Sequence, residues 1–384
     1  MSGTSTGEQT VVPEPVDEPT EPGEPWYHSR GVRLLSTFAA PIAAVLVLWV
    51  AFNYLRRPNH NRLLVASIAI LVGVAGVFLL FWAMNRFVDW LPEHFREGIR
   101  PYVFVGPALV MLSVFLIYPV LNTILISFKD AHGKKFAGLD NYRFVFTDPS
   151  MLNSIRNTFG WILFVPIVAV TIGLVFATLA DRLRRGEAVA KSLIFLPMAI
   201  SFVGAAVVWR FMYSFRPQGF GSNIGLMNGI VQGIGHNPIP WLQKKPWNNL
   251  LLMVIMVWMQ TGFAMVVLSA GIKAIPEEII EAARIDGASE FQVFWRITVP
   301  SILPTIVVVS TYMVINALKV FDIVFVMGNA EANGTEVMAE RMVSWFFIRD
   351  DDGKGAAIAV VLFLAVVPVM IWNIRRFRDL EEIR

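Results

Sequence analysis

Long hydrophobic stretches alternate along this chain with short polar segments. We count about eight apolar runs of roughly 20 residues, the length that crosses a ~30 Å hydrocarbon core as an α-helix. They cover residues 34 to 54, 63 to 85, 102 to 127, 158 to 180, 189 to 212, 249 to 272, 301 to 327 and 355 to 376. Apolar and polar residues do not alternate one by one within these runs, as they would in the strands of a barrel. The pattern therefore predicts an all-α polytopic membrane protein, whose helices satisfy their own backbone groups.

Composition supports the same class. Of the 384 residues, 55% are hydrophobic and 16% are charged, and the mean hydropathy is +0.58, far above that of a soluble domain. The net charge of +3 is scattered along the chain, so we expect no nucleic-acid partner. There is no cysteine, and the five histidines stand apart from one another outside the runs. We expect no metal site and no catalytic residue.

The first residues have a different composition. Residues 1 to 29 contain six acidic residues, five prolines and no Lys or Arg. So few apolar side chains predict a disordered tail, and the start lacks the basic region and short apolar region of a signal peptide. We expect three parts: a disordered cytoplasmic tail at 1 to 29, two accessory transmembrane helices at 30 to 100, and a main unit at 101 to 384.

A polar segment, residues 276 to 300, separates the sixth run from the seventh. Pro276 followed by two acids suits the first turn of a short helix, because proline lacks an N–H and acids favour the positive helix end. Gly287 can end that helix in the left-handed conformation. Ser289 with Gln292 forms a capping box for a second helix. The segment therefore predicts helix, turn, helix, although taken alone it could also be an interfacial hairpin in the lipid headgroups.

The same segment resembles the EAA loop of importer permeases in the ATP-binding-cassette family, with Val299 where Leu is usual. The family spacing is Glu-Ala-Ala, three residues, Gly, nine residues, then Ile and Pro, as it stands here between residues 281 and 300. The resemblance implies that seven residues couple the chain to an ATPase: Glu281, Ala282, Ala283, Asp286, Gly287, Ile297 and Pro300.

The resemblance to sugar-importer permeases covers residues 101 to 384. It is carried also by Gly138 to Tyr142, by Asn157 with Thr158, and by Phe321 with Asp322. The two helices before residue 100 resemble those that the maltose-type subunit carries in addition to its six-helix core. The sequence of residues 328 to 337 more closely resembles that of the α-glucoside and trehalose branch. The resemblance thus implies a permease subunit for a disaccharide or α-glucoside such as maltose or trehalose.

The same family implies several partners. They are a second permease subunit in a heterodimer, a cytoplasmic ATPase dimer, an external solute-binding protein, the sugar and the surrounding lipid. The chain lacks a Walker A pattern, so we expect no cofactor on it and ATP with Mg²⁺ on the partner ATPase. We expect a multi-pass protein of the plasma (inner) membrane with both termini cytoplasmic. The basic residues Arg182, Arg184, Arg185 and Lys191 support this orientation, and Arg56, Arg57 and Arg62 violate it.

A translocation path is expected on the sixth and seventh runs. Ser310 lies nine residues into its run, about 13.5 Å deep at 1.5 Å per residue, near mid-membrane. Sugar contacts carried over from the maltose-type permease, together with Asn316, give the predicted path residues Met259, Gln260, Phe263, Ser310, Met313, Val314, Asn316 and Ala317. Alternatively, Ser310 and its neighbour Thr311 bond back to their own helix or hold helices together.

Two other features carry hypotheses. Pro197 can kink the fifth run and act as a hinge for gating, or adapt packing without motion. Lys319 and Asp322 favour a local ion pair at i, i+3 spacing rather than a proton relay.

The rival function is an ion-gradient-driven secondary transporter, which usually places titratable groups near the midplane and shows internal repeats. Neither feature is visible. A membrane-embedded enzyme is disfavoured because His, Asp and Glu do not cluster in the runs.

Overall fold

The computed structural model describes residues 62–90, 92–183, 185–217 and 225–381, with scattered positions between 42 and 55. The predicted tail at 1 to 29 lies outside these residues, as does most of the first apolar run. The chain divides into two compact units, Met1–Tyr118 and Pro119–Arg384. The domain boundary expected at residue 100 stays a prediction.

The first unit contains two long helices, α2 (Arg62–Trp90) and α3 (Glu93–Leu112), followed by a π-helical segment, Ser113–Ile117. Both helices expose most of their apolar side chains. In the candidate spans Val65–Arg86 and His94–Ile126, only 6% and 0% of the most apolar stretch is buried. Such surfaces are stable in lipid or against another chain, because water would otherwise contact them.

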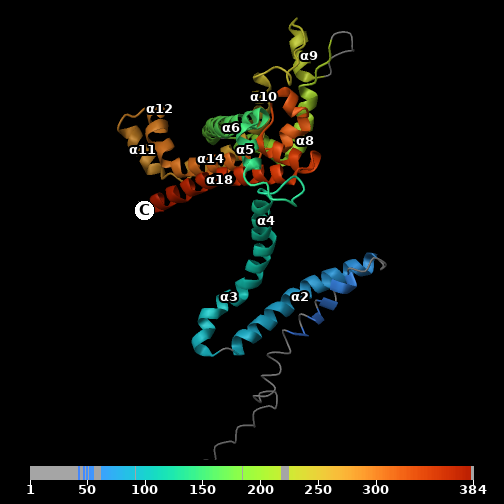
Figure 1. Ribbon diagram of the computed structural model, residues 1–384. Coiled ribbons are helices and arrows are strands. Elements are labelled where there is room, and N and C mark those ends of the chain that lie inside the picture. Colours follow the sequence, from blue (N-terminus) through green and yellow to red (C-terminus); the bar gives the residue numbers. More distant parts are fainter. Residues whose placement is uncertain are drawn as a thin grey trace, which may run out of the picture. The chain divides into compact units, whose positions relative to one another are not determined.

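The second unit is also helical, with a single isolated bridge between Lys129 and Phe136 in the described residues. Its helices are α4 (Tyr118–Ile126), α5 (Asp140–Thr147), α6 (Pro149–Asp181), α7 (Glu187–Phe195), α8 (Phe202–Met212), α9 (Leu226–Gly233), α10 (Trp247–Lys273), α11 (Glu277–Ile285), α12 (Glu290–Val293), α13 (Val299–Ser301), α14 (Leu303–Leu318), α15 (Asp322–Met327), α16 (Ala330–Asn333), α17 (Met338–Val343) and α18 (Asp352–Glu381). Figure 1 shows α11 and α12 projecting from one side of this unit, and α8 and α9 on the other side.

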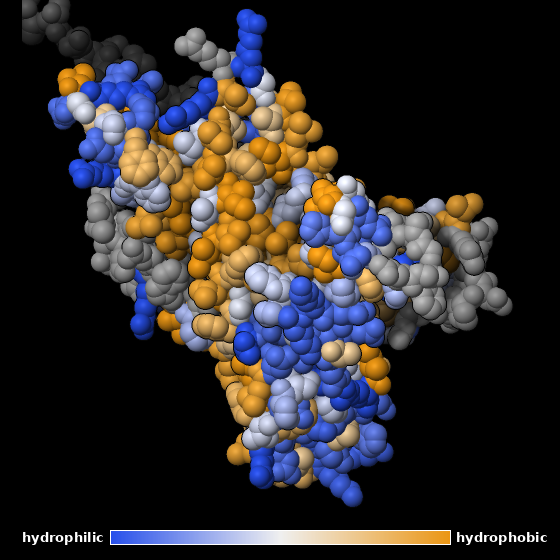
Figure 2. All heavy atoms as spheres, turned by 90° about the horizontal axis from the view of Figure 1, so that it is seen from above, coloured by the Kyte–Doolittle hydropathy of each residue, from blue (hydrophilic) through white to orange (hydrophobic). Residues whose placement is uncertain are grey.

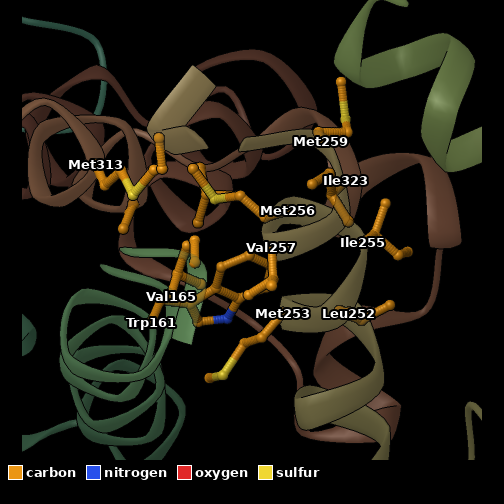
Figure 3. Packing of buried hydrophobic residues seen from close by; sticks show 14 of the residues in the cluster. Trp161, Val165, Leu252, Met253, Ile255, Met256, Val257, Met259, Met313 and Ile323 are labelled. Atoms are coloured by element: carbon orange, nitrogen blue, oxygen red, sulfur yellow. The ribbon is translucent and has the colours of Figure 1, made fainter. Parts of the chain in front are cut away.

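The core forms where α6, α10 and α14 contact one another. In α10, 61% of the most apolar stretch is buried, against 33% in α6, so α10 is the central helix. Met253 and Met256 of α10 lie beside Trp161 of α6 in this core, which also includes Met313 of α14 (Figure 3). The indole N–H of Trp161 donates to Asn249 Oδ1 at 3.0 Å, so its polar atom is satisfied. Elsewhere, hydrophobic side chains cover broad areas of the surface (Figure 2).

The all-α membrane class predicted from sequence is confirmed, but the number of eight spans is not. Among the described residues, four helices are long and apolar enough to cross a membrane, or up to six if each of two bent pairs counts as one span. The eighth apolar run is covered by α18.

The two bent pairs show where prolines act. α7 and α8 meet at 95°, across a 3₁₀ turn that contains Pro197. The predicted break at Pro197 is therefore confirmed, while its use as a hinge stays a prediction. The seventh run is not one helix: it bends by 66° at Ile302 and stops again after Leu318.

Candidate coupling element and translocation path

The segment Glu277–Ser301, which we name the coupling element, begins as the sequence predicted. Pro276 is the N-cap of α11, and Glu277 and Glu278 occupy its first turn. Gly287 ends the helix with φ +83°. Its N–H donates to Arg284 O at 3.1 Å, and the N–H of Ala288 donates to Ala283 O at 3.0 Å. This pair of bonds is a Schellman motif, which satisfies carbonyls that the helix end leaves free.

The second half of the coupling element begins with the predicted capping box. Ser289 Oγ accepts from the N–H of Gln292, and Gln292 Oε1 accepts from the N–H of Ser289 at 2.8 Å. α12 continues through a π-helical segment into α13. Arg284 and Glu290 form an ion pair of 2.9 Å across the turn. The predicted helix, turn and helix are thus confirmed, with local bonds fixing the turn.

The coupling element is open to a partner. Of the seven residues predicted for coupling, Glu281, Ala282, Asp286, Gly287 and Pro300 are exposed, and Ala283 and Ile297 are partly exposed. Sequence reasoning missed two large apolar side chains on the same element, Ile285 at 86% exposed and Phe291 at 73%. Their position within four residues of the predicted turn at Gly287 was a sequence feature that could have indicated their exposure. Together these residues give an element with charged and apolar contacts to offer.

A charged cluster lies where the last turn of α6, the first turns of α7 and the end of α10 meet. The amino group of Lys191 contacts the carboxylates of Asp181 and Glu187 and the hydroxyl of Ser269. Lys273 also contacts Glu187. The cluster links three helices just before the chain enters the coupling element. Sequence reasoning used Lys191 only for orientation and did not anticipate these ion pairs.

One further ion pair connects the coupling element to the bundle. Arg182, at the end of α6, lies 3.5 Å from Glu290 of α12. Both side chains are more than half exposed, so the pair contributes little stability by itself. It does place the coupling element beside the charged cluster. A displacement of the coupling element can therefore act on the charged cluster through this contact.

The predicted path residues are brought together on two facing helices. Met259, Gln260 and Phe263 lie on α10, and the other five lie on α14, which contacts α10. Met259, Gln260, Met313 and Ala317 are buried, while Phe263, Ser310, Val314 and Asn316 are partly buried. Met259, Met313 and Ala317 belong to the hydrophobic core in this conformation. The path role of all eight stays a prediction.

Polar groups on these helices behave in different ways. The hydroxyl of Thr311 donates to Val307 O at 2.8 Å and the amide of Asn316 donates to Tyr312 O at 2.9 Å, so both bond to their own helix. Gln260 is 3% exposed, and its Oε1 has no hydrogen-bond partner. A buried carbonyl oxygen without a donor is costly. Gln260 is therefore the predicted path residue whose side-chain oxygen lacks a hydrogen-bond donor.

The predicted local ion pair of Lys319 with Asp322 is wrong. Among the described residues, no ion pair within 4.0 Å joins them. α14 ends at Leu318 and α15 begins at Asp322, so the helical spacing that would pair them is interrupted. Asp322 instead begins α15, where a negative charge favours the helix N-terminus. Both residues line a small cavity of about 200 Å³ with Asn316.

The family motifs outside the coupling element hold loops in place. Asn157 donates to the carbonyls of Gly334 and Glu336 at 2.9 and 2.8 Å, and Thr158 Oγ1 accepts from the N–H of Met338 at 3.0 Å. Asn141 is buried and donates to two carbonyls near the end of α4. These motif residues are structural, because their side chains replace backbone partners that the loops lack.

A larger cavity of about 540 Å³ lies at the end of α10 opposite the coupling element, between α8, residues 240–243 and the loop after α15. Arg210 and Trp241 line it. Trp241 is held by a hydrogen bond from its indole N–H to Asn228 Oδ1 at 3.1 Å, and Arg210 donates to Val326 O at 3.2 Å. In the described residues, no three His, Asp or Glu side chains are close enough to hold a metal ion.

A family model and several known proteins match this chain. A family model described as binding-protein-dependent transport system inner membrane component matches residues 101–374. The osmoprotective compounds uptake permease protein GgtC of Synechocystis sp. is 52% identical, over 73% of this chain and 100% of its own length. The alpha-glucoside transport system permease protein AglF of Rhizobium meliloti is 47% identical, over 80% of this chain and 96% of its own length.

More distant matches are found by sequence and by structure. The trehalose/maltose transport system permease protein MalF of Thermococcus litoralis is 30% identical, over 74% of this chain and 96% of its own length. A chain of a bacterial ABC transporter involved in import of the acidic polysaccharide alginate matches with a TM-score of 0.65 and 20% identity, covering 75% of this chain and 98% of that one. At that identity the structural match shows the fold alone.

Proposed function

Because the chain belongs to the family of binding-protein-dependent transport system inner membrane components, we propose that it forms the sugar path of an ATP-driven importer and transmits the motion of a separate ATPase. The observation that carries this proposal is the exposed, capped coupling element between α10 and α14. It offers Glu281, with no ion pair of its own in the described residues, beside the exposed Ile285.

The substrate we propose is a neutral disaccharide or α-glucoside. The names of the relatives support this class: an alpha-glucoside permease, a trehalose/maltose permease and a permease for osmoprotective compounds. Within the bundle, Gln260 has a carbonyl oxygen without a donor, and Phe263 lies against Tyr312 with ring centroids 4.5 Å apart and the rings tilted by 42°. A sugar needs both kinds of surface, since its hydroxyls bond and its C–H faces pack.

The partners follow from the same proposal. A second permease would complete the path, and a solute-binding protein would deliver sugar from outside. A cytoplasmic ATPase dimer would bind ATP with Mg²⁺, so that this chain catalyses no covalent reaction. The exposed apolar surfaces of α2 and α3 leave room for lipid and for the second permease.

The length of α10 supports a crossing of the bilayer by this helix. Its 27 residues span about 40 Å at 1.5 Å per residue, so the two ends of α10 lie on opposite sides of a bilayer. If the coupling element is cytoplasmic, residues 213–248 and 328–354 are external. We also propose that both termini are cytoplasmic.

The mechanism we propose is a lever. ATP binds the closed ATPase dimer more tightly than the open one, and that difference in affinity supplies the bias between two conformations. Closure would pull the coupling element, and with it the charged cluster of Asp181, Glu187, Lys191 and Lys273, so that α6, α7 and α10 change their tilt together.

Uptake by the reconstituted complex tests this function. Proteoliposomes containing both permeases and the ATPase, with the solute-binding protein outside and ATP inside, should accumulate radiolabelled trehalose, maltose or sucrose only when ATP can be hydrolysed. Replacing ATP by a non-hydrolysable analogue is the control. Uptake by this chain alone, without ATP and abolished by an ionophore, would instead support the ion-gradient-driven transporter.

A further inference from the structure

A second cavity lies between α15, α16 and α17, at the end of α14 away from the coupling element. It has a volume of about 570 Å³, enough for a hexose ring. Its lining includes two acids, one base, a hydroxyl and two apolar side chains: Glu331, Glu340, Arg341, Ser344, Phe325 and Ile348. None of the predicted path residues lines it, and part of its lining, from Gly328 to Ala332, belongs to the segment 328 to 337 that resembles the α-glucoside and trehalose branch.

Glu340 is the unusual member of this lining. It is 9% exposed, and its Oε2 is buried without a hydrogen-bond partner. In the described part of the chain no base lies within 4.0 Å of its carboxylate, although Arg341 is adjacent in sequence. Glu336 is also buried, at 3% exposed; its Oε1 accepts from Asn153 at 2.9 Å, while its Oε2, like that of Glu340, has no partner. A buried carboxyl group without a partner costs free energy, and burial raises the pKa of Glu340.

Arg341 supplies the complementary group. It is 2% exposed, and one end of its guanidinium donates to Glu331 Oε2 at 2.9 Å. Its Nε, however, is buried and has no acceptor. Two residues of the lining therefore each hold one buried polar atom without a partner, a carboxyl oxygen of Glu340 and the Nε–H of Arg341. Leaving both unsatisfied is costly, so a ligand able to donate and accept at neighbouring atoms would remove both penalties.

The charges around the cavity select the kind of ligand. Arg349 also contacts Glu331, at 2.7 Å, so two acids and two bases nearly cancel. A strongly charged ligand would gain little. Neighbouring hydroxyls of a sugar ring both donate and accept, and the exposed Phe325 and Ile348 could cover the C–H face of the ring.

Resting on the proposed function, we propose that this cavity is an external carbohydrate subsite, in which Glu340 and Arg341 bind two neighbouring hydroxyls of a neutral hexopyranoside. With the coupling element inside, the cavity opens at the outer end of α14. A sugar released from the solute-binding protein would be held there before it enters the path between α10 and α14.

Saturation-transfer difference NMR on the full complex in nanodiscs, without the solute-binding protein, tests the subsite. The probes are methyl α-D-glucopyranoside and maltose, titrated to obtain dissociation constants. Glu340→Leu removes the carboxyl group at similar volume and should weaken binding of both probes roughly tenfold or more. Glu336→Gln is the matched control, because Glu336 is buried nearby but does not line the cavity; binding should be unchanged.

Thermal melting of the same complexes separates binding from structure. A buried carboxyl group whose partner is a ligand destabilises the ligand-free protein. Glu340→Leu should therefore melt at the same or a higher temperature than the wild type. A lower melting temperature, or loss of the second permease from the complex, would mean that Glu340 has a structural or interface partner, and would overturn the subsite.

Unchanged dissociation constants in Glu340→Leu, or no saturation transfer to either probe with the wild type, would also overturn it. The proposed function is judged separately, by ATP-dependent sugar uptake in the same preparations. Wild-type uptake with no effect of Glu340→Leu on probe binding removes the subsite alone, whereas absence of any uptake removes the function.

Discussion

Gly173 sets how closely α6 and α10 approach. A Cβ atom built at Gly173 would lie 2.5 Å from Ala264 Cβ and 3.0 Å from the backbone nitrogen of Met265. Neither atom can move without the α10 backbone, so Gly173→Ala forces the two helices apart. Gly160, on the same helix, is the matched control, since an added Cβ there would meet only the flexible end of Met253, at 3.4 Å.

The expected difference follows from two effects. Replacing glycine by alanine inside a helix gains about 0.5 to 1 kcal/mol in either variant. Only Gly173→Ala adds overpacking, which costs about 1 to 3 kcal/mol. Because the first effect cancels in the comparison, Gly160→Ala should be more stable than Gly173→Ala by about 1 to 3 kcal/mol.

Denaturant unfolding of the purified complex, checked by fluorescence-detected thermal melting, measures this difference. Equal stability of the two variants would refute the reasoning, because it would show that α6 and α10 are not in close contact at Gly173. Lower stability of Gly160→Ala would refute it as well.

Three further outcomes are expected. Asp148→Ala should destabilise the complex by about 1 kcal/mol, because Asp148 Oδ1 caps α6 by accepting from two backbone N–H groups; equal melting of variant and wild type would contradict this. Burial raises the pKa of Glu340 above 4.5, so its contribution to stability is complete below pH 4.5 and is lost as pH rises through the folded-state pKa. The melting temperature of Glu340→Leu should therefore increasingly exceed that of the wild type from pH 4 to 8, and a gap that shrinks would be contrary. Glu281→Lys should abolish sugar-stimulated ATP hydrolysis while the permease stays inserted, and unchanged coupling would remove the proposed role of Glu281.

Local features could be predicted from the sequence. The end of α11 at Gly287 and the capping box of Ser289 with Gln292 depend on residues within a few positions, so spacing alone determines them. The break at Pro197 is local for the same reason. The membrane class follows from apolar runs, because a bilayer imposes the length of its helices.

Features that depend on distant segments could not be predicted. Lys319 and Asp322 do not pair because α14 ends at Leu318 and α15 begins only at Asp322, which spacing does not reveal. The burial of Glu340 depends on the packing of α17 against α6 and α18, which are distant in the sequence or follow it. The contact of Gly173 with Ala264 joins residues far apart in the chain, and nothing near Gly173 in the sequence marks it.

Cross-linking from residue 281 tests the central claim most directly, since the chain has no cysteine and one engineered thiol reports one position. In the assembled complex, Glu281→Cys should form a covalent adduct with the ATPase through a short bifunctional maleimide, provided that the ATPase carries a cysteine in its docking surface. Gln243→Cys, at the other end of α10, should form none and should react with an impermeant maleimide from outside. Labelling of Glu281→Cys from the outside, with no adduct to the ATPase, would contradict the account.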